Sequence, residues 1–167
     1  QMNKTEYLIS KMSYENAENS RILNACLKNW FDNPKILNFV SPSLDFPFRY
    51  TQWLKLYKSM TKRNIHNQSY IIQKNESLVV GYISLFFNNE LKETNIFHLI
   101  IDPQFQGKGL SKKLFEFVEN VAIKENFGSM SLYVNRKNNS LTNLVENLGY
   151  KPRRSNKKVI YYTKIIT

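Results

Sequence analysis

Residues 94–114 constrain the fold of this chain more than any other segment. Thr94 to Ile101 (TNIFHLII) is an apolar, β-branched run whose end hardly alternates, which is typical of a strand covered on both faces. A short loop with Gly107 and Gly109 follows, and an amphipathic helix begins near Leu110. A buried strand that leads through a glycine loop into a helix predicts helices packed on a central sheet.

The remaining pattern extends this sheet. We expect strands over 7–12, 69–73, 78–87, 129–134 and 159–166, and helices over 16–30, 48–62 and 141–148. The polar turn 74–77 predicts that the second and third of these strands form an antiparallel hairpin. Pro34, Pro42 and Pro47 indicate a loop. The sequence therefore predicts one α+β domain over residues 1–167, with a twisted mixed sheet of six to seven strands and helices on both faces.

The charge of the chain is strongly positive and unevenly distributed. The net charge is +11, and residues 104–167 hold 12 Lys/Arg against 4 Asp/Glu, a surplus of +8. Such a field attracts a polyphosphate ligand or a nucleic acid, but the chain carries no recognised nucleic-acid motif, so nucleic acid ranks last among the expected partners. No apolar run reaches the ~20 residues that span a bilayer, and residues 1–10 lack the core of a secretory signal. We expect a cytoplasmic protein with no membrane contact, as a monomer or homodimer.

The loop from Gln106 to Ser111 has the composition of a phosphate site. Glycines there remove the Cβ atoms that would keep a ligand from the backbone, and the amides of the first helical turn point outward at the positive end of the helix dipole. The spacing matches neither a Walker A loop nor the three-glycine dinucleotide fingerprint. A diphosphate linker in another cofactor is the predicted ligand.

Two segments resemble the GCN5-related N-acetyltransferase (GNAT) superfamily. Gln106, Gly109 and Ser111 match its Gln/Arg-x-x-Gly-x-Gly/Ala loop, with Ser111 in place of the last small residue. Asn138, Leu144, Gly149 and Tyr150 resemble its Asn-x-x-Ala-x-x-Leu-Tyr-x-x-x-Gly-Phe segment. The resemblance implies acetyl-CoA as acyl donor, a sheet splayed between its fourth and fifth strands, and no metal. It also implies three sets of cofactor contacts: the pantetheine arm along Leu99, Ile100 and Ile101; the pyrophosphate on Gln106, Gly107, Lys108, Gly109, Leu110 and Ser111; and Asn138 near the reactive end.

Acetyl transfer to an amine needs a base for the ammonium proton, and two residues are candidates. Glu93 precedes the cofactor strand by a spacing similar to that of the catalytic glutamate in the ribosomal-protein alanine N-acetyltransferases of this family. His98 interrupts the strand itself. An exposed carboxylate and a hydrogen-bonded core histidine are the competing interpretations. Simple alternation puts the two on opposite faces of the strand, unless a bulge intervenes.

The proton donor to the leaving thiolate is less defined by the sequence. The family often uses a tyrosine where this chain has Val145, so water, Tyr133 or Tyr150 would have to serve. The predicted function is transfer of an acetyl group to a primary amine, which could be a protein N-terminus, a lysine, a polyamine or a small molecule. The alternative is a noncatalytic acyl-CoA-sensing module on the same fold.

Overall fold

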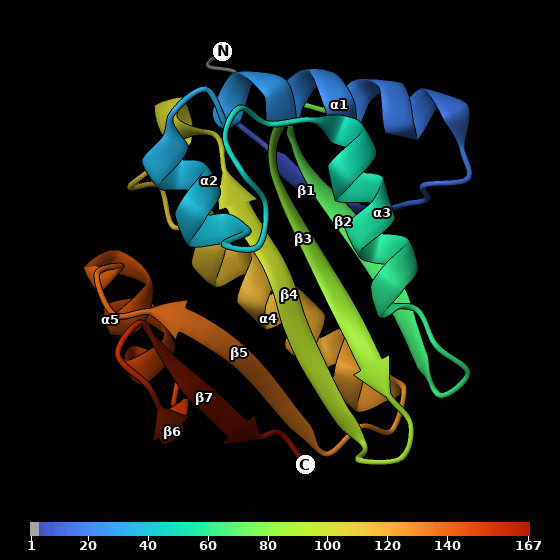
Figure 1. The fold of residues 1–167 in the computed structure, drawn as a ribbon. Helices are drawn as coiled ribbons and strands as arrows, with labels where there is room; N and C mark the ends of the chain where they lie inside the picture. The colour runs from blue at the N-terminus through green and yellow to red at the C-terminus, as the bar shows by residue number, and fades with distance from the viewer. Residues whose placement is uncertain (1–3) are drawn as a thin grey trace.

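The computed structural model describes residues 4–167 as a single α+β domain (Figure 1). Its strands are β1 (Tyr7–Met12), β2 (Ile65–Lys74), β3 (Leu78–Asn88), β4 (Glu93–Ile101), β5 (Ser129–Asn135), β6 (Lys151–Ser155) and β7 (Val159–Ile165). Its helices are α1 (Ala17–Trp30), α2 (Pro34–Val40), α3 (Tyr50–Met60), α4 (Leu110–Lys124) and α5 (Asn139–Asn147), with a short 3-10 turn at Pro103–Phe105. Within residues 4–167, no helix is both long and apolar enough to cross a bilayer.

The seven strands form one sheet in the order β1-β2-β3-β4-β5-β7-β6. Neighbouring strands are antiparallel except β4 and β5, which are parallel. The mixed sheet, the β2–β3 hairpin and most of the predicted elements are therefore confirmed.

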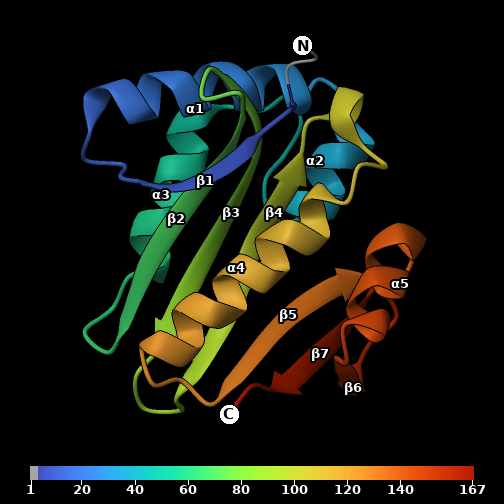
Figure 2. The same cartoon turned by 180° about the vertical axis from the view of Figure 1, so that it is seen from behind.

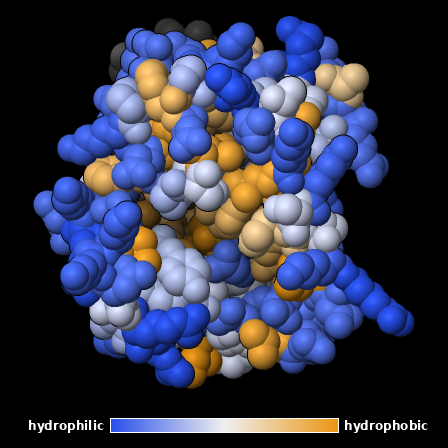
Figure 3. All heavy atoms as spheres, viewed as in Figure 1, coloured by the Kyte–Doolittle hydropathy of each residue, from blue (hydrophilic) through white to orange (hydrophobic). Residues whose placement is uncertain are grey.

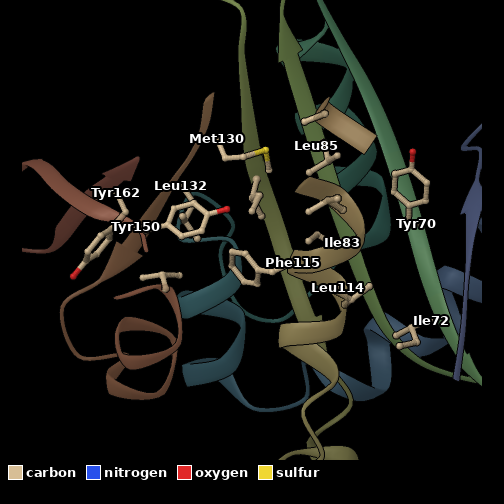
Figure 4. Close-up of a cluster of buried hydrophobic side chains, with 14 of the residues drawn as sticks. Tyr70, Ile72, Ile83, Leu85, Leu114, Phe115, Met130, Leu132, Tyr150 and Tyr162 are labelled. Atoms are coloured by element: carbon tan, nitrogen blue, oxygen red, sulfur yellow. The ribbon is translucent and has the colours of Figure 1, made fainter. Parts of the chain in front are cut away.

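Helices cover both faces of the sheet, and each face has its own apolar cluster. Helices α1, α2 and α3 lie on one face, where Leu27 and Trp53 are fully buried (Figure 1). Helix α4 crosses the other face and α5 lies beside it near β5 and β7 (Figure 2). There Leu114 and Phe115 of α4 pack against buried side chains of the sheet (Figure 4). Burial on both sides explains the continuous apolar run of β3.

Two elements depart from the expected pattern. The segment around Pro34 was expected to be a loop, but it forms α2, with Asn33 as N-cap and Pro34 in the first turn. Strand β6 was not predicted, because all five of its residues are exposed and it lies at the sheet edge, so it shows no apolar alternation. Both elements border the functional site described below.

Strands β4 and β5 start side by side and then diverge (Figure 1). They pair only over three residues, from Glu93 with Ser129 to Asn95 with Ser131. Beyond them the register of β4 against β3 shifts, which leaves Phe97 as an extra residue in a bulge. A bulge bends its strand, so it turns the end of β4 away from β5 and opens a split in the sheet.

Candidate active site

A glycine loop lies at the mouth of this split, between β4 and α4. Gly107 and Gly109 have φ angles of 76° and 74°, which side chains with a Cβ rarely adopt. A Cβ at either position would meet no atom within 4 Å, so both glycines border open space. Gly109 is the N-cap of the 15-residue helix α4 and offers no side-chain cap. The first amides of α4 are thus left without an intrahelical acceptor, next to that open space.

Side chains of the loop fasten it to the end of β4. The Asp102 carboxylate accepts a hydrogen bond from the Gln104 amide at 2.9 Å, which caps the 3-10 turn. The Gln106 side-chain amide donates to the Ile101 carbonyl at 3.1 Å. These bonds hold the loop in one position relative to the strand, as preorganised binding requires.

The edge of β4 that faces the split carries backbone groups available to a ligand. The Asp102 amide donates to the Val80 carbonyl of β3 at 2.8 Å, so alternation also turns the backbone groups of Ile100 toward β3. Leu99 then directs its amide and carbonyl into the split, and so does Ile101, whose carbonyl already accepts from Gln106. Their position suits an extended chain lying along β4 as an added strand.

A cavity of about 430 Å³ occupies the split. Of the residues predicted to bind cofactor, nine line it: Leu99, Ile100, Ile101, Gln106, Gly107, Gly109, Leu110, Ser111 and Asn138. Lys108 is exposed and does not line the cavity, whereas Lys112, one turn further along, does. Asn138 is the N-cap of α5, and its side-chain oxygen accepts from the Leu141 amide at 3.2 Å. A further wall comes from Ile36, Phe39 and Val40 of α2, a helix that the sequence pattern did not predict.

A second cavity, of about 320 Å³, lies on the other side of Phe39 and Val40 of α2, which line both cavities. Asn95, Phe97 and His98 of β4 and Tyr133 of β5 line this second cavity, which we call the chamber. Figure 3 shows a hollow edged by hydrophobic side chains near the middle of this side of the molecule. On β4 the linings of the two cavities adjoin between His98 and Leu99.

His98 lines the chamber but is fully engaged by the protein. Its Nδ1 is 2.7 Å from the Tyr57 hydroxyl, its Nε2 is 3.0 Å from the Ser41 hydroxyl, and its ring stacks on Trp53 with centroids 4.1 Å apart. Burial lowers the pKa of His98 to about 3. At neutral pH the ring is therefore uncharged.

The bulge overturns the simple alternation expected for β4. Phe97 and His98 are consecutive, yet both rings pack on Tyr57 of α3, with centroids 5.6 and 5.4 Å away. His98 thus lies on the same side of the sheet as Glu93 rather than on the opposite side. The physical reason is the extra residue in the strand, which reverses the facing of every later side chain.

Glu93 lies at the opposite end of β4 from the glycine loop, where β4 and β5 are still paired. Its carboxylate accepts a hydrogen bond from the Tyr161 hydroxyl of β7 at 2.9 Å. The Arg154 guanidinium lies 4.1 Å from the centre of the Tyr161 ring and donates to the Tyr133 hydroxyl at 3.2 Å. The pKa of Tyr161 is raised, mainly by burial and also by the hydrogen bond to Glu93. Through Tyr161 and Arg154, Glu93 is thus connected to Tyr133 at the edge of the chamber.

Comparison with known families identifies the fold and its class of chemistry. The sequence model of the acetyltransferase (GNAT) family matches residues 28–150, which include the glycine loop and α5. The chain belongs to the acetyltransferase (GNAT) family. It is therefore an enzyme of the acetyltransferase class.

Solved structures of acetyltransferases share the fold. The ribosomal-protein-S18-alanine N-acetyltransferase of Escherichia coli superposes with a TM-score of 0.69 at 17% identity, over 97% of this chain and 95% of that one. The spermidine N-acetyltransferase of Vibrio cholerae, in complex with CoA and spermine, gives 0.73 at 15% identity, over 95% of each chain. The Thermoplasma acidophilum paia N-acetyltransferase, in complex with coenzyme A, gives 0.67 at 16% identity, over 96% and 99%. No curated protein matches by sequence.

For a GNAT enzyme, the hydroxyl groups near the chamber matter as proton donors. Val145 of α5 is fully buried in the core. The Tyr150 hydroxyl donates to Glu119 of α4 at 2.8 Å, on the far face of the sheet. Tyr133 is 55% exposed and lines the chamber. Of Tyr133 and Tyr150, the tyrosines singled out in the sequence, Tyr133 is thus the one that lines the chamber.

The described part of the chain, residues 4–167, contains no group of three or more His, Cys, Asp or Glu side chains placed to hold a metal ion.

Proposed function

We propose that this GNAT enzyme transfers the acetyl group of acetyl-CoA to a primary amine by direct attack. One observation carries the proposal: two left-handed glycines, bordered by open space, precede the uncapped N-terminus of α4 at the mouth of the split. Backbone amides at a helix N-terminus bind phosphate oxygens, and here they face the cavity beside β4. The solved relatives named for acetylation of an alanine of ribosomal protein S18 and of spermidine support an amine as the acceptor class.

The residues around the split have defined roles in this proposal. Gly107, Gly109 and Ser111 present amides to the pyrophosphate, Lys112 adds a positive charge, and the edge of β4 holds the pantetheine arm. The Leu99 amide polarises the thioester carbonyl and stabilises the oxyanion of the tetrahedral intermediate. That intermediate collapses by release of the CoA thiolate, and Tyr133 is the hydroxyl that protonates it.

Glu93 is the proposed base, acting through Tyr161. In this relay the Tyr161 hydroxyl gives its proton to Glu93 and receives the proton of the attacking amine. His98 is a much weaker candidate, because a group with a pKa of about 3 accepts few protons at neutral pH. His98 instead shapes the chamber.

A Glu93→Gln variant tests this role. We expect kcat/KM to fall about 100-fold, within the range typical of general acid–base catalysis. Glutamine still accepts the Tyr161 hydrogen bond but takes up no proton, so the stabilisation by acetyl-CoA should not change. The control is Glu90→Gln in the exposed β3–β4 turn, which should keep full activity. Activity of Glu93→Gln within threefold of the wild type would rule out the carboxylate as base.

Acetyl-CoA binding and turnover test the function itself. At ~100 times its Kd, acetyl-CoA should stabilise the folded protein by about 2.7 kcal/mol. The measurement is thermal unfolding with acetyl-CoA, longer acyl-CoAs and nucleotides, followed by release of free thiol in the presence of a panel of amines. Stabilisation without thiol release for any amine would indicate the sensing module instead. Equal stabilisation by ATP and acetyl-CoA would contradict both.

A further inference from the structure

A third cavity, of about 700 Å³, adjoins the chamber. Five residues line both the chamber and this cavity: Asn38, Phe39, Pro42, Asn135 and Val159. It shares only Phe39 with the first cavity, which lies in the split beside the glycine loop. An acceptor amine can therefore approach the chamber through this third cavity, which we call the acceptor mouth.

The acceptor mouth is lined with positive charge. All its charged lining residues are basic, and they come from three separate segments: Lys35 of α2, Arg136 and Lys137 after β5, and Lys157 and Lys158 before β7. Within residues 4–167, none of the five forms an ion pair. Of residues 4–167, no Asp or Glu lines the adjoining chamber.

Hydrogen bonds connect the two segments that carry four of these five cations. The Arg136 amide donates to the Lys158 carbonyl at 2.9 Å, and the Arg136 Nε donates to the Asn156 carbonyl at 2.7 Å. These bonds tie the segment after β5 to the β6–β7 turn. Five like charges without counter-charges repel one another, and an anion bound among them relieves that repulsion.

We infer that the acceptor carries a carboxylate or phosphate group close to its amine, and that the acceptor mouth binds this anion while the amine enters the chamber. The inference rests on the proposed function and narrows its substrate class. A polycation such as a polyamine would have to pass the same charges, which disfavours it. The glycine loop proposed to bind the donor diphosphate lines the cavity in the split, which shares only Phe39 with the acceptor mouth, so that proposed site does not account for this cluster.

Matched acceptors test the inference. Two sets of short peptides differ only after the N-terminal residue, where one set has acidic residues and the other has lysines. We expect kcat/KM for the acidic peptides to be at least about tenfold higher. Phosphoethanolamine and ethanolamine give the same comparison for small amines. Whichever of the acidic peptide and phosphoethanolamine has the higher kcat/KM shows whether the anion is a carboxylate of a peptide or the phosphate of a small molecule. Spermidine should be a poor acceptor.

A charge reversal locates the effect. Lys157 and Lys158 are exposed at the tip of a turn, and we expect Lys157→Glu with Lys158→Glu to lower kcat/KM for the acidic acceptor about tenfold and to raise it for the basic one. The KM for acetyl-CoA should not change. The control is Lys55→Glu with Lys58→Glu on the exposed side of α3, which changes the net charge equally but lies outside the mouth. Both variants keep the backbone bonds of Arg136.

Binding separates failure of this inference from failure of the proposed function. Fluorescent versions of the peptides, titrated into the CoA-saturated enzyme, should bind in the same order of preference even where turnover is slow. Equal or tighter binding of the basic peptide, or an equal loss in the α3 control, would overturn the inference and leave acetyl transfer intact. A change in the KM for acetyl-CoA alone would assign the cluster to the donor and also overturn it.

Discussion

A Gly109→Trp variant is expected to bind acetyl-CoA at least about 100-fold more weakly than the wild type while it stays folded. The space beside Gly109 is open, so an indole there meets no protein atom near its Cβ and fills the volume assigned to the diphosphate. At an acetyl-CoA concentration of ~100 times the wild-type Kd, the stabilisation should fall from about 2.7 to about 0.4 kcal/mol or less. Thermal or urea unfolding with and without acetyl-CoA measures the difference.

Backbone strain requires its own control in this experiment. A side chain at a φ of 74° costs roughly 1–2 kcal/mol whether or not a ligand is present. Gly149, after α5, has a φ of 94°, and a Cβ there meets only the Lys164 side chain at an ordinary 3.7 Å. Gly149→Ala should therefore destabilise the protein but keep the full response to acetyl-CoA. If Gly109→Trp keeps that response as well, the pyrophosphate binds elsewhere.

The glycine-loop half of the candidate site could be predicted from the sequence because its determinants are local. A positive φ demands glycine, and Gly107 and Gly109 stand within a few residues of a buried strand and an amphipathic helix. Lys108 shows the limit of this reasoning. The motif includes it, but the tight turn exposes it to solvent, and the charge that lines the cavity belongs to Lys112.

The other half of the candidate site, around Glu93 and His98, depends on contacts that no local pattern reveals. Tyr161 and Glu93 are 68 positions apart in the chain, and their hydrogen bond exists only because β5 lies between β4 and β7. The bulge at Phe97 has no residue signature, although it decides which way His98 faces. Helix α2 did carry a start signal, Asn33 followed by Pro34, but seven residues are too few for a helical period to stand out.

Acid should destabilise this protein through His98, which is the second large effect that we expect. The pKa of His98 is about 3 in the folded chain, because the ring is buried, and near 6.5 when unfolded. Between these values the unfolded chain binds a proton that the folded chain does not, so stability falls as the pH drops below about 6.5. From pH 7.5 to pH 5.0 the loss should be about 2 kcal/mol.

The neighbours of His98 make this effect separable from other titrations. The groups that face it are Tyr57, Trp53 and Ser41, together with Ser84 opposite it on β3, and none carries a charge between pH 5 and 8. His98→Gln should be less stable than the wild type at pH 7.5, but should lose about 2 kcal/mol less on acidification. Urea unfolding at both pH values measures this.

The same variant separates a structural role of His98 from a catalytic one. A base removed from the chamber would lower kcat at every pH above its pKa, whereas a ring that only shapes the chamber would mainly change stability and the KM for the amine. We therefore expect kcat of His98→Gln at pH 8 to stay within about tenfold of the wild type. A larger fall, with the acid-dependent loss of stability unchanged, would make His98 the base in place of Glu93. The pH dependence of the free energy of unfolding thus reports the structural role of His98, and kcat independently reports its catalytic role.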